Sequence, residues 1–122
     1  MARILVIDDE APLRLNLVRF LRLEGHEVAD ASDGEAGLMS ARHYPPDLIF
    51  CDLMMPRMNG MDLLTELQSD ATLKTIPFFF ISASAEPERL AEGLKLGASG
   101  YLTKPFSLSQ ISTILSSHLG HL

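Results

Sequence analysis

Short apolar segments alternate with stretches of helical periodicity along the whole chain, and this alternation limits the folds that the chain can adopt. After the apolar run at 3–7, for example, Leu13, Leu17 and Leu21 recur at helical spacing. Strand–helix units in strict succession favour a parallel sheet with helices on both faces. Since no linker, low-complexity segment or repeat interrupts them, we expect one domain over 1–122. The expected strands cover 3–7, 26–31, 48–51, 76–81 and 99–103.

Proline, glycine and polar residues indicate where several helices begin and end. Pro12 suits the first turn of a helix, and Gly25 suits its end. The segment 32–35, with the sequence SDGE, matches a capping box that opens a second helix. Pro87 opens a later helix, which Gly97 is expected to terminate. The strands that are most apolar throughout should be central in the sheet.

Charge and composition exclude several functional classes. The net charge is −6, with only 10 Lys and Arg residues, which argues against direct binding to nucleic acid phosphates. The first apolar run is too short for a signal peptide, and no stretch approaches the length of a membrane span. The single cysteine, Cys51, cannot form an internal disulfide. We therefore expect a cytoplasmic protein that binds neither nucleic acid nor membrane directly.

Polar residues end or follow four of the five expected strands. Asp8 and Asp9 follow the first strand, Asp52 the third, Ser82 the fourth and Lys104 the fifth. In an open parallel sheet, ligands bind beyond the carboxyl ends of the strands. We therefore expect these residues to form a site.

The chemistry of this set favours a divalent cation and a phosphoryl group. Three carboxylates about 5 Å apart repel by roughly 3 kcal/mol per pair at an effective dielectric constant of about 20, which one lysine cannot offset. Oxygen ligands of this kind suit Mg²⁺. A carboxylate can also attack phosphorus when the phosphoryl charge is neutralised. The open alternative is that Asp8 and Asp9 only cap the first helix, and that Ser82 is a turn residue.

Four short motifs carry a family resemblance. They are VIDDE at 6–10, DLMMPRMNG at 52–60, ISAS at 81–84 and YLTKPF at 101–106. With these motifs in this order, the chain resembles the receiver domain of two-component response regulators. The resemblance implies a flavodoxin-like (βα)5 fold of the α/β class, a doubly wound five-stranded parallel sheet in strand order 2-1-3-4-5.

The resemblance assigns an acceptor and a metal site. Asp52 would be the phosphorylated residue. Asp9, Asp52 and the backbone carbonyl of Met54 would bind Mg²⁺ directly, and Asp8 would assist through water. Mg²⁺ is the only cofactor that this resemblance implies.

The resemblance also assigns residues that bind the phosphoryl group and report its presence. Lys104 and the Ser82 hydroxyl would bind phosphoryl oxygens, together with Asp52 as the catalytic group. A cis peptide between Lys104 and Pro105 would direct the lysine. Inward movement of Ser82 would let Tyr101 turn and so alter the surface of the fourth helix, fifth strand and fifth helix.

By the same resemblance, the domain catalyses only its own phosphorylation and dephosphorylation and is not otherwise an enzyme. Its phosphodonor would be a histidine kinase or phosphotransfer protein that docks around Asn16 and the loop 105–108. Its output would pass to a downstream target protein or a fused output domain. Two alternatives stay open: a receiver-like module that binds partners without phosphorylation, and an aspartyl-phosphate phosphatase of the haloacid dehalogenase type.

Overall fold

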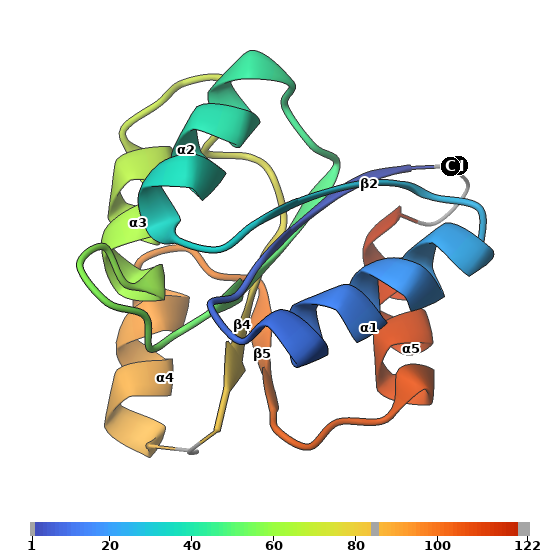
Figure 1. Cartoon of the computed structure of the whole chain (residues 1–122). Helices are drawn as coiled ribbons and strands as arrows, with labels where there is room; N and C mark the ends of the chain where they lie inside the picture. Colours follow the sequence, from blue (N-terminus) through green and yellow to red (C-terminus); the bar gives the residue numbers. More distant parts are fainter. Residues whose placement is uncertain (1, 84–85, 120–122) are drawn as a thin grey trace.

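The computed structural model describes residues 2–83 and 86–119, and strands alternate with helices throughout (Figure 1). No helix in this part of the chain is long and apolar enough to cross a membrane. The elements are β1 (Arg3–Ile7), α1 (Ala11–Leu23), β2 (Glu27–Ala31), α2 (Gly34–His43), β3 (Leu48–Asp52), α3 (Gly60–Gln68), β4 (Phe78–Ser82), α4 (Pro87–Lys95), β5 (Gly100–Thr103) and α5 (Leu108–Leu119).

The strands form one parallel sheet in the order β2-β1-β3-β4-β5. This arrangement confirms the predicted flavodoxin-like fold. The chain runs from β1 outward to β2, then crosses back to place β3 on the other side of β1. Strand order therefore reverses between β1 and β3, which is where a ligand site is expected in such sheets.

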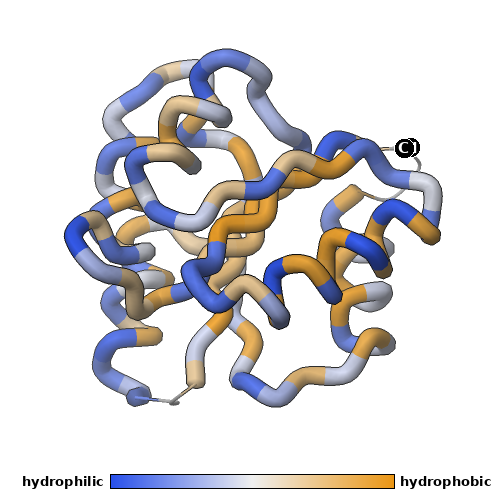
Figure 2. The backbone as a smooth tube through the Cα atoms, in the orientation of Figure 1, coloured by the Kyte–Doolittle hydropathy of each residue, from blue (hydrophilic) through white to orange (hydrophobic). Residues whose placement is uncertain are grey.

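Two apolar cores lie on opposite faces of the sheet (Figure 1). Helices α1 and α5 cover one face, and α2, α3 and α4 cover the other. Figure 2 shows that hydrophobic residues are concentrated in the strands between these layers. Every residue of β3 and β4 is buried, which confirms that the most apolar strands lie inside the sheet. Rigid central strands of this kind hold their carboxyl ends in fixed positions.

Most of the predicted helix ends are confirmed, but one cap was predicted wrongly. Pro12 lies in the first turn of α1, and Gly25 and Gly97 have φ angles of +92° and +114° beyond the ends of α1 and α4. The N-cap of α2 is Asp33 rather than Ser32, because the Asp33 carboxylate accepts the Ala36 N–H at 2.8 Å. The predicted capping box at 32–35 is therefore wrong.

A capping box does occur at α3, where sequence reasoning did not place one. The Asn59 side chain accepts the Asp62 backbone N–H at 2.9 Å, and the Asp62 carboxylate accepts the Asn59 N–H at 3.3 Å. This reciprocal pair fixes the end of the loop that follows Asp52.

Two strand boundaries differ slightly from the prediction in a way that matters for the site. Strand β4 begins at Phe78, because Pro77 has no N–H to give to the sheet, and it continues to Ser82. Strand β3 likewise continues to Asp52. Asp52 and Ser82 are thus the last residues of two adjacent strands.

Candidate functional site

The carboxyl ends of β1, β3, β4 and β5 bring together most of the predicted site residues. Asp8 follows β1, Asp52 ends β3, Ser82 ends β4 and Lys104 follows β5. Asp8, Asp52 and Ser82 are the buried polar or charged residues of the described chain, with exposed fractions of 1%, 4% and 0%. Burying a polar group costs free energy unless the group is hydrogen-bonded, and burying a charge costs more unless it is paired or binds a metal. Their concentration at one point marks this edge of the sheet as a site.

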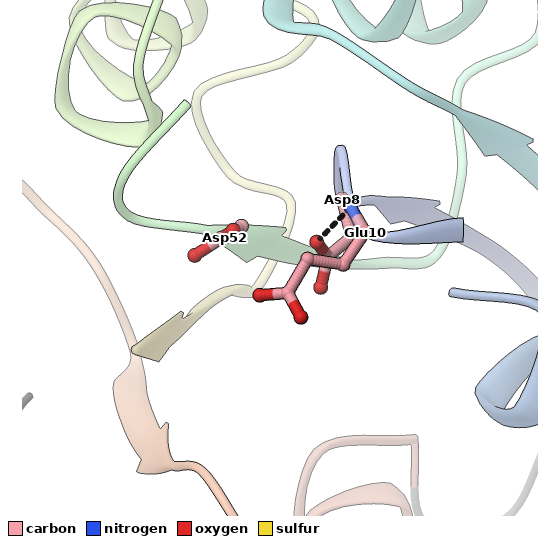
Figure 3. A group of neighbouring side chains, drawn as sticks. All are labelled: Asp8, Glu10 and Asp52. Carbon is pink, nitrogen blue, oxygen red and sulfur yellow. Dashed lines mark hydrogen bonds between the residues drawn. The ribbon is translucent and has the colours of Figure 1, made fainter. Parts of the chain in front are cut away.

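Three carboxyl groups form a cluster at this edge (Figure 3). One carboxylate oxygen from each of Asp8, Glu10 and Asp52 lies within 4.8 Å of the others. Sequence reasoning did not select Glu10 as a site residue, although Glu10 ends the VIDDE motif. The predicted ligand Asp9 is exposed and lies outside this group, but its side chain accepts a hydrogen bond from the protonated Asp52 carboxyl group, which helps to raise the pKa of Asp52.

Lys104 extends its ammonium group to all three members of the acid cluster. Its Nζ lies 2.9 Å from Glu10 Oε1, 3.3 Å from Asp8 Oδ2 and 3.5 Å from Asp52 Oδ2. The Lys104 backbone N–H donates to the Ser82 carbonyl at 2.7 Å, which fixes the start of the side chain against β4. The Lys104-Pro105 peptide is cis, the conformation that the resemblance implies.

Crowding of negative charge shifts the pKa values of this site. Burial, followed by the charge of Asp8, raises the pKa of Asp52 to about 7, although Lys104 and the Met54 N–H act to lower it. Burial acts to lower the pKa of Lys104, but its hydrogen bond to Glu10 and the charges of Asp52 and Asp8 outweigh this and raise it. Among the described residues, only the Lys104 ammonium contacts the three acids of this cluster. Its single positive charge is too little to balance their negative charge.

The donor set fits Mg²⁺. Asp8 Oδ2 is buried and has no hydrogen-bond partner, so this oxygen has an unused acceptor position at the centre of the site. Carboxylate oxygens are the ligands that Mg²⁺ prefers. A divalent cation here would satisfy that oxygen and reduce the repulsion between the acids.

Met54 follows Asp52 closely and joins the site to α4. Its backbone N–H donates to Asp52 Oδ1 at 3.3 Å, which orients the carboxyl group. Its exposed side chain accepts a hydrogen bond from the Arg89 guanidinium, with Nη1 2.7 Å from Sδ. Sequence reasoning missed Arg89, because nothing in its local sequence links it to a loop 35 residues earlier.

Tyr101 lies on β5, which β4 separates from the Asp52 strand β3. It pairs with Phe80 across the sheet, and 45% of its surface is exposed. The ring therefore lies at the protein surface, on the same strand that leads to Lys104. Ser84, the last residue of the ISAS motif, lies outside the described residues.

A groove is formed by α1 and the segment after β5. It measures about 440 Å³ and includes Asn16 of α1 together with Phe106 and Leu108. The remaining lining residues are Leu13, Leu17, Arg19, Phe20 and Leu23. An apolar groove with a few polar groups at its edge is a typical binding surface for another protein.

Comparisons with known proteins give consistent results. The family model described as "Response regulator receiver domain" matches residues 4–116. A probable transcriptional regulatory protein of Picosynechococcus is 42% identical over 117 residues, covering 90% of this chain and 46% of that protein. Transcriptional regulatory protein PrrA of Mycobacterium tuberculosis is 39% identical over 109 residues, covering 89% and 46%. The chain thus spans about half the length of the curated relatives that it matches.

Solved structures agree with these relatives. The chemotaxis protein CheY4 of Vibrio cholerae, at 30% identity, has a TM-score of 0.91 over 97% of this chain and 98% of the CheY4 chain. A putative response regulator from Chloroflexus aurantiacus, at 28% identity, also gives 0.91 and covers 98% of both chains. These matches extend over nearly the whole chain.

Proposed function

This chain belongs to the response regulator receiver domain family, and from that membership we propose that Asp52 is the residue that accepts a phosphoryl group. Receiver domains are signalling domains of two-component systems and are generally not enzymes acting on external substrates. We further propose that residues 1–122 form one such domain. The named relatives are regulators, which argues against the phosphatase alternative.

The observation that carries the proposal is the position of the Asp52 carboxyl group. It ends a fully buried strand, and its Oδ2 lies 3.5 Å from the Lys104 ammonium. Ser82 ends the neighbouring strand and pairs with Thr103, the residue before Lys104. A nucleophile, a hydroxyl and an ammonium held on adjacent rigid strands suit transfer of a phosphoryl group.

In the proposed transfer, an Asp52 carboxylate oxygen forms a bond to phosphorus while the phosphorus–nitrogen bond of a partner phosphohistidine breaks. The bonding electrons stay on the leaving imidazole nitrogen. Lys104 and the Ser82 hydroxyl bind the phosphoryl oxygens as charge develops on them. Transfer of the phosphoryl group to water later restores the Asp52 carboxylate.

Mg²⁺ would bind beside the Asp8 and Asp52 carboxyl groups and supply positive charge next to the phosphoryl oxygens. Asp9, Asp52 and the Met54 carbonyl would hold the metal directly, and Asp8 would assist through water. Asp8 Oδ2 is buried without a hydrogen-bond partner and shares the Lys104 ammonium with two other acids, and the pKa of Asp52 is raised; both observations support such a cation site. Lys104 offsets only part of the negative charge.

The proposed phosphodonor is a histidine kinase or phosphotransfer protein that docks in the groove around Asn16 and the loop 105–108. That groove lies between α1 and the start of α5 and contains apolar side chains suited to a partner helix. The proposed output surface is formed by α4, β5 and α5, which Ser82 and Tyr101 would link to Asp52. A downstream protein or a fused output domain, rather than the receiver, would carry out the response.

Intact-mass spectrometry after incubation with acetyl phosphate and Mg²⁺ tests the acceptor. We expect one phosphoryl adduct, absent in EDTA and absent in Asp52→Asn. Glu66→Gln, an exposed acid on α3, is the matched control and should retain the adduct. An adduct that persists in Asp52→Asn would place the acceptor elsewhere. Absence of any adduct, together with no binding of beryllofluoride, would favour a phosphorylation-independent module.

A further inference from the structure

We propose that Glu10 is a positioning residue that holds the Lys104 ammonium in the unphosphorylated protein and releases it when a phosphoryl group occupies Asp52. The inference rests on the proposed role of Asp52 and adds a competitor for Lys104. Of the three carboxylates that Lys104 Nζ contacts, Glu10 is the nearest, at 2.9 Å. Lys104 is therefore held more closely by Glu10 than by the acceptor, whose Oδ2 lies 3.5 Å away.

The backbone fixes Glu10 beside the cluster and leaves its side chain available. Glu10 is the N-cap residue of α1, but its side chain makes no capping hydrogen bond. Its backbone N–H instead donates to Asp8 Oδ1 at 2.9 Å. In Figure 3 the Glu10 side chain reaches into the space between Asp8 and Asp52. The carboxylate is thus directed to Lys104 and not to the helix that it precedes.

Differences in exposure decide which of these contacts can be broken at least cost. The Glu10 side chain is 61% exposed, whereas those of Lys104, Asp52 and Asp8 are 12%, 6% and 1% exposed. Glu10 can turn into water without uncovering buried surface, whereas Asp8 and Asp52 cannot. An exposed partner of a buried ammonium is also a weak partner. Glu10 is therefore the contact that Lys104 gives up.

A phosphoryl group on Asp52 would need the same ammonium that Glu10 holds. Its oxygens carry negative charge, so the nearby Glu10 carboxylate both repels them and competes for Lys104. Removing the Glu10 contact should therefore favour the phosphorylated form. The acid acts through Lys104 and takes no part in bond formation.

Beryllofluoride, which occupies the phosphoryl position on an acceptor aspartate, provides the test. We would titrate it by fluorine NMR at a Mg²⁺ concentration that saturates each variant. Glu10→Gln should bind beryllofluoride roughly two- to fivefold more tightly than the parent, the size expected for losing one exposed ion-pair partner. Glu10→Asp keeps the charge but shortens the side chain and should show most of the same gain. Glu66→Gln should match the parent.

A second measurement follows Lys104 directly. The nitrogen-15 resonance of its ammonium group should move in metal-free Glu10→Gln and stay unchanged in Glu66→Gln. Unchanged or weaker beryllofluoride binding in Glu10→Gln would overturn the inference, as would a Glu10→Asp variant identical to the parent, since charge alone would then be responsible. Failure of the parent to bind beryllofluoride would instead count against Asp52 as the acceptor.

Discussion

The buried carboxyl groups of Asp8 and Asp52 share a single ammonium group, with Lys104 Nζ 3.3 Å from Oδ2 of the first and 3.5 Å from Oδ2 of the second. The two acids lie at the carboxyl ends of β1 and β3, between which strand order reverses. Shared neutralisation is incomplete, because one ammonium faces these two carboxylates and that of Glu10 as well. The stability of the metal-free protein should therefore depend on how much negative charge this site carries.

Metal-free protein should lose stability as pH rises from about 4 to about 7, the interval between the ordinary pKa of Asp52 and its value in the fold. Burial and Asp8 raise that pKa from 3.8 to about 7. Between these two pH values the folded state keeps a proton on Asp52 that the unfolded state has already lost. Raising the pH therefore favours the unfolded state, and above about pH 7 the ionised Asp52 carboxylate destabilises the fold by a constant amount. Asp52→Asn should remove this slope and add roughly 2 to 4 kcal/mol at pH 8.

Urea denaturation in EDTA at intervals between pH 4.5 and 8 measures this effect. The difference in unfolding free energy between Asp52→Asn and the parent should grow with pH and then level off. Parallel curves over this range would show that ionisation of Asp52 carries no cost in the fold.

Mg²⁺ should stabilise the parent by about 2 to 3 kcal/mol at a hundredfold excess over its Kd. Asp52→Asn and Asp9→Asn should lose most of this gain, because both residues are proposed ligands. In EDTA, Asp9→Asn should raise the melting temperature less than Asp52→Asn does, because Asp9 is exposed whereas Asp52 is buried among the other acids. Thermal melts with and without Mg²⁺ provide the measurement, with Glu66→Gln as control. If Glu10→Gln lost the gain and Asp9→Asn kept it, Glu10 rather than Asp9 would be the ligand.

Sequence reasoning located the elements well because their determinants are local. The helical spacing of leucines, Pro12 at a helix start and Gly97 at a helix end each act within a few residues. Asp52 and Lys104 could be placed at strand ends for the same reason. The strand order came from the family resemblance, since alternation alone does not determine which strands are neighbours.

Features that depend on distant contacts could not be predicted in this way. From the sequence alone, Glu10 is an ordinary exposed acid at the start of a helix. Its role depends on its hydrogen bond to Lys104, which lies 94 positions away in the chain. The capping error at Ser32 has a different cause. Both Ser32 and Asp33 are good N-cap residues, so the choice between them depends on backbone geometry that the pattern does not contain.

Replacing Gly93 with alanine should destabilise the protein by about 1 to 3 kcal/mol, although alanine is the better helix former. A Cβ at Gly93 would lie 2.4 Å from Phe80 Cε2, in the contact between α4 and β4. Equilibrium urea denaturation gives the change in unfolding free energy. In a Phe80→Leu background, whose shorter side chain removes the clash, the same substitution should be close to neutral. An equal loss in both backgrounds would locate the cost outside this contact.

Tyr101 should respond to occupancy of the acceptor site, and the only other tyrosine, Tyr44, provides an internal control. Both rings are exposed, at 45% and 69%, but Tyr44 lies near Arg3, at the amino end of β1 and away from the acid cluster. With 3-fluorotyrosine incorporated, beryllofluoride and Mg²⁺ should shift the Tyr101 fluorine resonance and leave that of Tyr44 in place. Ser82→Ala should abolish the shift, because the Ser82 hydroxyl is proposed to link the ring to the phosphoryl position. A Tyr101 signal that stays unchanged while beryllofluoride is bound would rule out this residue as the switch.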